Sequence, residues 1–155
     1  MSKRMDAYFM GIAELTASLS RCVRLHVGAV IALDERPIAT GYNGTVSGEP
    51  NCEDAFRDGA FTMEQHHDWS NVHEIHAEMN AVAFAARSGI ALEGCTMYVT
   101  HQPCDQCLKN LYQCGFKRIV YKHPYVRTTD GNVFMRLPKM TVERYIEKER
   151  IGAKP

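Results

Sequence analysis

The chain has 155 residues, and 18 Lys and Arg balance 18 Asp and Glu, so its formal net charge is zero. A hydrophobic fraction of 45% is typical of a globular protein with a buried core, which excludes an intrinsically disordered chain and predicts a single domain covering 1–155. The charge balance also argues against a broad basic surface for a nucleic-acid duplex.

The first half of the chain predicts a helix followed by a β-hairpin. Apolar residues three and four positions apart favour an amphipathic helix over 5–22. Two short apolar runs follow at 27–33 and 38–42, and the polar residues 34–37 between them predict the turn of the hairpin. Residues 44–74 are polar and show no periodicity, so we expect a long loop insertion that serves function or is ordered by a ligand.

The second half alternates predicted helices and strands. Residues 77–87 and 104–114 predict helices, 96–100 and 118–121 predict strands, and 141–150 predict a terminal helix. Strands that alternate with helices indicate an α/β fold. We expect a three-layer α/β/α sandwich with a mixed central sheet, whose antiparallel pair is the opening hairpin.

The cysteines are expected to be thiols rather than disulfides. No stretch approaches the roughly 18 consecutive apolar residues of a membrane span. Residues 1–10 lack the apolar run of a signal peptide, which predicts a cytoplasmic protein in a reducing compartment with no membrane partner. There, metal ligands or buried thiols are favoured for Cys22, Cys52, Cys95, Cys104, Cys107 and Cys114.

Three residues have the spacing of a catalytic zinc site. Cys104 and Cys107 lie three residues apart at the start of a predicted helix, so their sulfurs share one face. Helix N-termini favour thiolates, the form that binds zinc. His76 adds a nitrogen ligand, and three protein ligands leave the fourth tetrahedral position to water. Zinc lowers the pKa of that water to about 7, which supplies a hydroxide nucleophile.

Glu78 is the candidate proton carrier. It follows His76 by two residues, so both side chains approach one metal ion only if they lie in the first turn of a helix. His-x-Glu followed by Pro-Cys-x-x-Cys is the signature of zinc nucleobase deaminases, in which the glutamate is not a ligand. The alternative, a closed structural zinc with Glu78 as fourth ligand, is disfavoured because structural sites prefer Cys and His.

With these motifs, the sequence resembles the deoxycytidylate (dCMP) deaminases of phage type, in the cytidine deaminase-like superfamily. The resemblance rests on five segments that span most of the chain in the family order: 27–30, 41–44, 74–81, 96–100 and 103–107. The zinc motif belongs to the whole superfamily. The Gly-Tyr-Asn-Gly turn, joined to His-Ala-Glu-x-Asn-Ala, narrows the resemblance to dCMP deaminases.

The resemblance implies hydrolysis of dCMP to dUMP and ammonia, which would supply dUMP for thymidylate synthesis. Zinc hydroxide would attack C4 of the cytosine, while Glu78 would protonate N3 and then the leaving amino group. The backbone of Ala77 would bind the base edge, Asn43 the deoxyribose, and Tyr125 would close the pocket. His101 lies near the mouth by its position and is a further candidate substrate contact.

The resemblance also implies allosteric control of a homohexamer, by dCTP as activator and dTTP as inhibitor. The candidate effector contacts are Gly41, Tyr42, Asn43, Gly44 and Arg87. From the residues alone, the plainer explanation of this turn is a sharp exit from a strand, where glycine and asparagine tolerate positive φ. Arg87 is equally explained by a solvated helix end. A phage origin would place the protein in the host cytoplasm.

A second, structural zinc follows from the same resemblance. The positions that match its ligands in the phage enzyme are Cys22, Cys52, His67 and Glu74. An ion held there would order the aperiodic segment. The spacing alone is weak, His66 and His73 are adjacent alternatives, and a carboxylate departs from the usual structural ligand set. The plainer alternative is a pair of buried thiols with solvated histidines.

Other interpretations remain open. Lys122 and His123 could neutralise a substrate phosphate or lie in an exposed loop. The chain could instead be another zinc deaminase, acting on tRNA adenosine, cytidine or guanine, but a tRNA enzyme needs a basic surface that the charge balance does not favour. A catalytically silent zinc module that binds nucleotides or a protein is disfavoured because it would not need Glu78.

Overall fold

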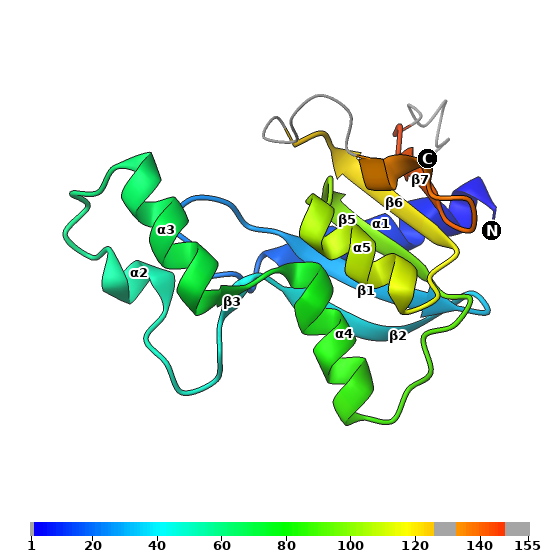
Figure 1. Cartoon of the computed structure of the whole chain (residues 1–155), viewed down its shortest axis with the longest axis horizontal. Coiled ribbons are helices and arrows are strands. Elements are labelled where there is room, and N and C mark those ends of the chain that lie inside the picture. Colours follow the sequence, from blue (N-terminus) through cyan, green and yellow to red (C-terminus); the bar gives the residue numbers. More distant parts are fainter. Residues whose placement is uncertain (1, 126–132, 148–155) are drawn as a thin grey trace, which may run out of the picture.

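The computed structural model describes residues 2–125 and 133–147 (Figure 1). No helix in these two ranges is long and apolar enough to cross a bilayer. The elements, in chain order, are α1 (Lys3–Ala17), β1 (Gly28–Leu33), β2 (Arg36–Tyr42), β3 (Gly44–Thr45), α2 (Cys52–Ala55), α3 (Met63–His73), β4 (Glu74–Ile75), α4 (Ala77–Arg87), β5 (Thr96–His101), α5 (Asp105–Gln113), β6 (Arg118–His123), the 3-10 helix η1 (Val133–Arg136) and β7 (Thr141–Arg144).

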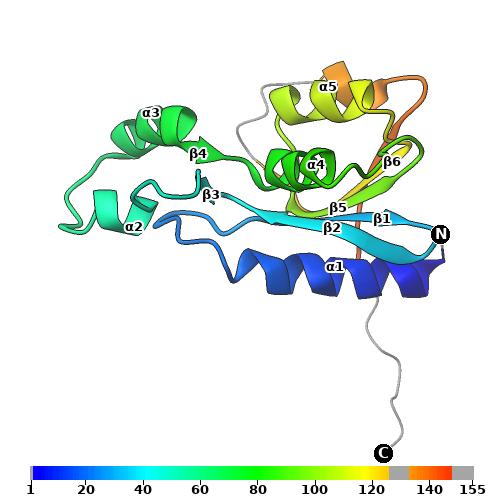
Figure 2. The ribbon, with the colours of Figure 1, turned by 90° about the horizontal axis from the view of Figure 1, so that it is seen from below.

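Five strands form one sheet in the order β2-β1-β5-β6-β7. β1 is antiparallel to both β2 and β5, whereas β5, β6 and β7 are parallel. Helix α1 covers one face of the sheet, and α4 and α5 cover the other (Figure 2). The predicted three-layer sandwich around a mixed sheet is therefore confirmed.

Side chains of β5 alternate between two buried clusters. Met97 and Val99 are fully buried in the cluster under α4 and α5. Tyr98, between them, is buried in the cluster under α1, together with Phe9 and Val120. Because side chains alternate along a strand, the same pattern sets which residues at the ends of β5 and β6 lie on the side of α4 and α5.

Two glycines let a helix lie close against a strand. A Cβ atom on Gly41 of β2 would lie 2.3 Å from the carbonyl oxygen of Ala77 in α4. A Cβ atom on Gly28 of β1 would lie 2.0 Å from the carbonyl oxygen of Ala13 in α1. Both distances are far below van der Waals contact, so packing requires glycine at both positions.

An ion-pair network joins α1 to the parallel strands β5, β6 and β7. Arg118 donates two hydrogen bonds to the carboxylate of Asp6, at 2.6 Å and 2.9 Å. The hydroxyl of Tyr98 donates to the same carboxylate at 2.7 Å, and Arg118 also pairs with Glu143 of β7. The network ties together one helix and three strands of the sheet.

The prediction of a loop throughout 44–74 is wrong in part, because α2 and α3 lie within it and β3 pairs with β4. Helix α3 begins with a capping box: Thr62 Oγ1 accepts from the amide of Gln65, whose side chain accepts from the amide of Thr62. The helix is polar on most sides, so hydrophobic periodicity does not reveal it.

The terminal helix predicted over 141–150 is also wrong. Residues Thr141–Arg144 form β7, which pairs in parallel with β6. Without this strand, the outer edge of β6 would have no ladder partner among the described residues. The amide of Tyr145 extends the pairing by donating to the carbonyl of Tyr121 at 2.7 Å. Residues 148–150 lie outside the described part of the chain.

Candidate metal centre and active site

Three of the predicted zinc ligands meet at the start of two helices. His76 is the N-cap residue of α4, Cys104 is the N-cap residue of α5, and Cys107 lies in the first turn of α5. Both helices begin at the side of the sheet that faces α2 and α3 (Figure 1). Their free N-terminal amides and dipoles favour negative charge at this place.

The distances within this cluster fit a zinc ion. Nδ1 of His76 lies 3.6 Å from Sγ of Cys104 and 3.4 Å from Sγ of Cys107. Tetrahedral zinc, with Zn–S about 2.3 Å and Zn–N about 2.0 Å, separates a sulfur and a nitrogen ligand by about 3.5 Å. The three donor atoms are therefore spaced to hold such an ion, and a tetrahedral zinc with three protein ligands has a fourth position for water.

The pKa values of the three side chains in this cluster are shifted in different directions. The hydrogen bond from Cys107, aided by His76 and opposed by burial, lowers the pKa of Cys104 to about 4. The bond to Cys104 raises the pKa of His76 to about 9, and contact with the same sulfur raises the pKa of Cys107. Cys104 is thus a thiolate at neutral pH, and a bound cation would displace the protons on its two neighbours.

Glu78 lies in the first turn of α4, and it is only 4% exposed. Burial raises its pKa, although the charge of His76 opposes the effect. The carboxyl group interacts with His76, Cys104 and Cys107, which places it next to this cluster of candidate metal ligands. A buried carboxyl whose pKa is raised binds a proton more readily than an exposed one, which suits a group that carries protons.

A second cluster joins Cys22, Cys52 and His66. Nε2 of His66 lies 3.4 Å from the sulfur of Cys22 and 3.3 Å from that of Cys52, and the two sulfurs are 4.0 Å apart. These separations also match a tetrahedral zinc site. All three residues are buried.

His67, the predicted histidine of this cluster, does not belong to it. It is exposed, and its Nε2 faces the side-chain amide of Asn71 at 3.1 Å. Consecutive helical residues point about 100° apart, so only one of the pair 66–67 can face the thiols. The alternative His73 stacks on Trp69 instead, with ring centroids 4.8 Å apart.

Glu74 is oriented by one hydrogen bond and has one unpartnered oxygen. Ser70 Oγ donates to Oε2 at 2.6 Å, whereas Oε1 is buried and has no hydrogen-bond partner. The charge of Glu74 acts on both Cys52 and His66. A buried carboxylate oxygen without a partner is costly, and a cation bound beside it would remove that cost.

The residues predicted to bind substrate differ in their contacts within the protein. Asn43 accepts from the amide of Val27 at 2.8 Å and donates to the carbonyl of Leu25 at 2.9 Å, so its side chain already fixes this segment. Ala77 is fully buried at the first position of α4. The amide of Tyr125 faces the side-chain oxygen of Gln102 at 3.5 Å. Their contacts with substrate stay predictions.

The glycine-containing turn borders a cavity of about 320 Å³. Of the predicted effector residues, Tyr42 and Gly44 line this cavity, whereas Gly41 packs against α4 and Asn43 is buried. Arg87 is at the opposite end of α4, with its guanidinium 5.9 Å from the ring centroid of Phe84. The structure therefore does not bring Arg87 to the turn.

Two positions escaped sequence reasoning. Asn80 lines the cavity and donates to the carbonyl of Tyr42 at 2.8 Å, which links α4 to the turn. Its place in the His-Ala-Glu-x-Asn motif was the available signal. Gln102 contacts the amide of Tyr125, and its Nε2 donates to the sulfur of Met135 at 3.8 Å. No sequence pattern indicates these contacts of Gln102.

Residues 3–123 match the family model for the cytidine and deoxycytidylate deaminase zinc-binding region. The chain belongs to this family. The resemblance stated from the motifs is thereby confirmed. The family's description also names zinc, the metal whose ligand spacing the first cluster reproduces.

The chain is also similar to curated proteins and to a solved structure. The deoxycytidylate deaminase of Enterobacteria phage T4 is 36% identical over 151 residues, which cover 77% of this chain and 78% of that protein. ComE operon protein 2 of Bacillus subtilis is 41% identical over 127 residues, which cover 79% of this chain and 64% of that protein. A structure of dCMP deaminase from the cyanophage S-TIM5, in complex with dCMP and dUMP, matches with a TM-score of 0.77 and 32% identity, over 94% of this chain and 99% of that one.

Proposed function

We propose that this chain is a zinc-dependent dCMP deaminase that converts dCMP and water to dUMP and ammonia. The observation that carries the proposal is the contact between the buried carboxyl of Glu78 and the cluster of His76, Cys104 and Cys107. Relatives named deoxycytidylate deaminase, and the similar cyanophage enzyme in complex with dCMP and dUMP, support dCMP as the substrate.

The roles follow from the geometry. His76, Cys104 and Cys107 would hold the zinc, which supplies an ionised water as nucleophile when it is bound. Glu78 takes one proton from the attacking water and delivers it to N3 of the cytosine, and then carries the second proton of that water to the leaving amino nitrogen, so that the carboxyl returns to its starting state as ammonia leaves. The amide of Ala77 is one of the first-turn amides of α4 that lack a helical acceptor, so it can donate to the edge of the base.

Steady-state assays with dCMP, cytidine, dCTP and a tRNA stem-loop test the substrate. We expect turnover of dCMP with a far higher kcat/KM than that of the other three compounds. Turnover of one of those three without turnover of dCMP would refute the proposal in favour of another deaminase. No turnover of any compound by zinc-loaded protein would favour the silent binding module.

We infer that a second zinc is held by Cys22, Cys52, His66 and Glu74. The spacing of the two sulfurs and the imidazole nitrogen supports this, as does the unpartnered buried oxygen of Glu74. Elemental analysis is expected to find two zinc ions per chain in the natural protein and one in Cys52→Ser. The half-buried Cys114 belongs to neither cluster, so Cys114→Ser is the matched control and keeps two. A single ion in the natural protein would contradict the second site.

Control by dCTP and dTTP in a homohexamer is also part of the proposal. A cavity of about 320 Å³ is within the size range of ligand sites, and Asn80 links it to the helix that carries Glu78. We expect dCTP to lower and dTTP to raise the KM for dCMP, and Asn80→Ala to weaken both effects. Sedimentation should give six times the chain mass of 17.5 kDa. A monomer whose kinetics ignore both nucleotides would contradict this part.

A further inference from the structure

Two histidines end neighbouring parallel strands on the side of the sheet that carries the metal-binding cluster. His101 ends β5, His123 ends β6, and the two are register partners. Alternation from Met97 and Val99 directs His101 to the side of α4 and α5. Ligands of such sheets bind beyond the carboxyl ends of parallel strands, which is where both histidines lie.

The side chain of Lys122 points away from this side of the sheet. Lys122, which precedes His123, pairs with Glu14 of α1 and with Glu147, on the opposite face of the sheet. It is therefore excluded as the neutralising group that the sequence suggested. The two imidazoles contact each other, with ring centroids 5.1 Å apart.

The contact of His101 with Thr100 indicates which ring nitrogen carries the proton. Thr100 Oγ1 accepts from the amide of Gly28 at 3.2 Å and lies 3.1 Å from Nδ1 of His101. The hydroxyl hydrogen of Thr100 is then free to donate to Nδ1, which leaves the proton of a neutral ring on Nε2. Burial, and next the charge of His123, lower the pKa of His101, so the neutral donor form prevails at neutral pH.

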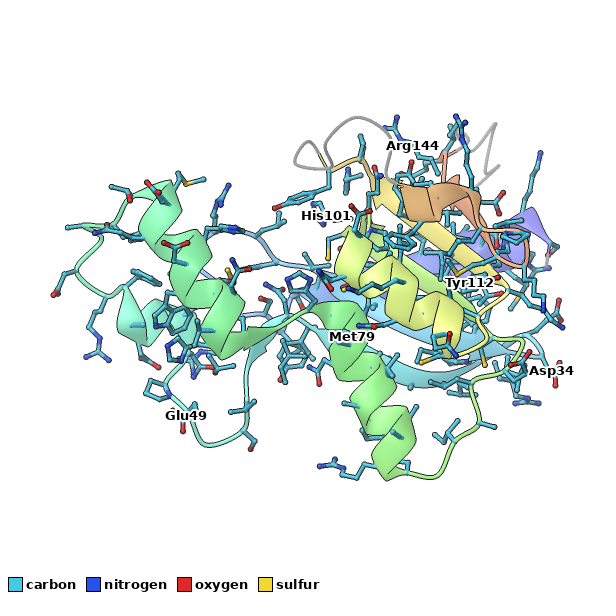
Figure 3. The ribbon with its side chains drawn as sticks, viewed as in Figure 1. Asp34, Glu49, Met79, His101, Tyr112 and Arg144 are labelled. Carbon is cyan, nitrogen blue, oxygen red and sulfur yellow. The ribbon has the colours of Figure 1, made fainter. Side chains whose placement is uncertain are left out.

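Figure 3 shows His101 beside the first turn of α5, the turn that carries Cys104 and Cys107. His101 precedes Cys104 by three residues, so their Cα atoms are at most about 11 Å apart. A nucleotide whose base is at the metal-binding cluster must place its phosphate at the other end of the molecule. Imidazole N–H groups are suitable donors for phosphate oxygens.

We propose that His101 and His123 together bind the 5′-phosphate of the substrate and so select nucleotides over nucleosides. The proposal rests on the dCMP deaminase activity proposed above and assigns one part of its substrate recognition. The pair acts on binding of the phosphate and does not touch the reacting atoms. Its loss should therefore raise the KM for dCMP and leave kcat nearly unchanged.

The test compares substrates with and without the phosphate. His101→Phe and His123→Phe keep a ring of similar shape and remove its N–H donors. We expect each variant to raise the KM for dCMP by about tenfold or more, as for loss of a hydrogen bond to a charged group, and to leave kcat/KM for deoxycytidine within about twofold. Calorimetry should show the same selective loss for dUMP against deoxyuridine, independently of turnover.

Two controls define the result. His67→Phe makes the same change at an exposed histidine of α3 and should behave as the natural protein. Lys122→Gln removes the cation on the opposite face and should leave the dCMP to deoxycytidine ratio unchanged. Equal losses with both substrates, or an unchanged KM for dCMP in both histidine variants, would overturn the proposal. Absence of dCMP turnover by the natural protein would instead refute the proposed function.

Discussion

Replacement of Gly41 by alanine tests whether the position of α4 controls catalysis. The new methyl group would lie 2.3 Å from the carbonyl oxygen of Ala77 and 2.4 Å from the amide nitrogen of Ala81. Both atoms belong to the backbone of α4, so no side-chain rotation can relieve the contact. The helix has to move, and its first turn carries Glu78 beside the metal-binding cluster.

The size of the effect follows from these distances. Ordinary contact begins at 3.4 Å, so the oxygen of Ala77 must recede by about 1.1 Å. Overpacking of this kind costs about 1–3 kcal/mol of unfolding free energy. A displacement of about 1 Å at catalytic groups can reduce the rate by about 100-fold. We therefore expect Gly41→Ala to lose both stability and most of its kcat for dCMP.

Gly28→Ala is the matched control. Its methyl group would lie 2.0 Å from the carbonyl oxygen of Ala13, which forces α1 away from the opposite face of the sheet. This variant should lose a similar free energy of unfolding in urea and keep its kcat at temperatures where it is folded. If Gly41→Ala were as destabilised as Gly28→Ala but kept the natural kcat, the inferred control of the site by the placement of α4 would be wrong.

Two further predictions concern stability. Burial raises the pKa of Asp6, but hydrogen bonds from Arg118 and Tyr98 outweigh it, so the folded pKa is below the ordinary 3.8. The ion pair of Asp6 and Arg118 therefore stabilises the fold above pH 3.8, and this stabilisation is lost as the pH falls through the folded pKa of Asp6. Asp6→Asn should lower the free energy of unfolding in urea by about 2–4 kcal/mol near neutral pH. An equal loss at acid pH would contradict this. The hairpin turn holds Asp34 and Glu35 at φ of 47° and 61°, so Asp34→Asn with Glu35→Gly should stabilise by about 1 kcal/mol at unchanged kcat, and destabilisation would refute the turn assignment.

The central sheet could be predicted because its sequence signals agree with its burial. The strands 27–33 and 96–100 are short apolar runs, and in the structure nearly every residue of β1 and β5 is buried. The hairpin turn was predicted over 34–37, whereas in the structure it consists of Asp34 and Glu35, because Leu33 already pairs with Arg36. The three residues of the candidate metal-binding cluster, and Glu78 beside them, could be found because each short motif lies at the start of a helix, where its spacing places the side chains on one side.

The errors arose where neighbouring segments decide the structure. Residues 141–144 carry a helix-like pattern, but the open edge of β6 captures them as a strand. Helix α3 has little apolar periodicity, and it is fixed by its capping box and by His66 beside two distant thiols. Which of two adjacent histidines faces those thiols depends on the rotation of α3, which spacing alone does not specify.

The most direct test of the account is the zinc content and dCMP turnover of Glu78→Gln, measured on one preparation. The account predicts the same zinc content as the natural protein and a kcat lower by about 100-fold or more, because an amide cannot carry the proton. Glu64→Gln, at an exposed position of α3, should retain both properties. A Glu78→Gln protein that keeps its zinc and deaminates dCMP at the natural rate would contradict the central claim.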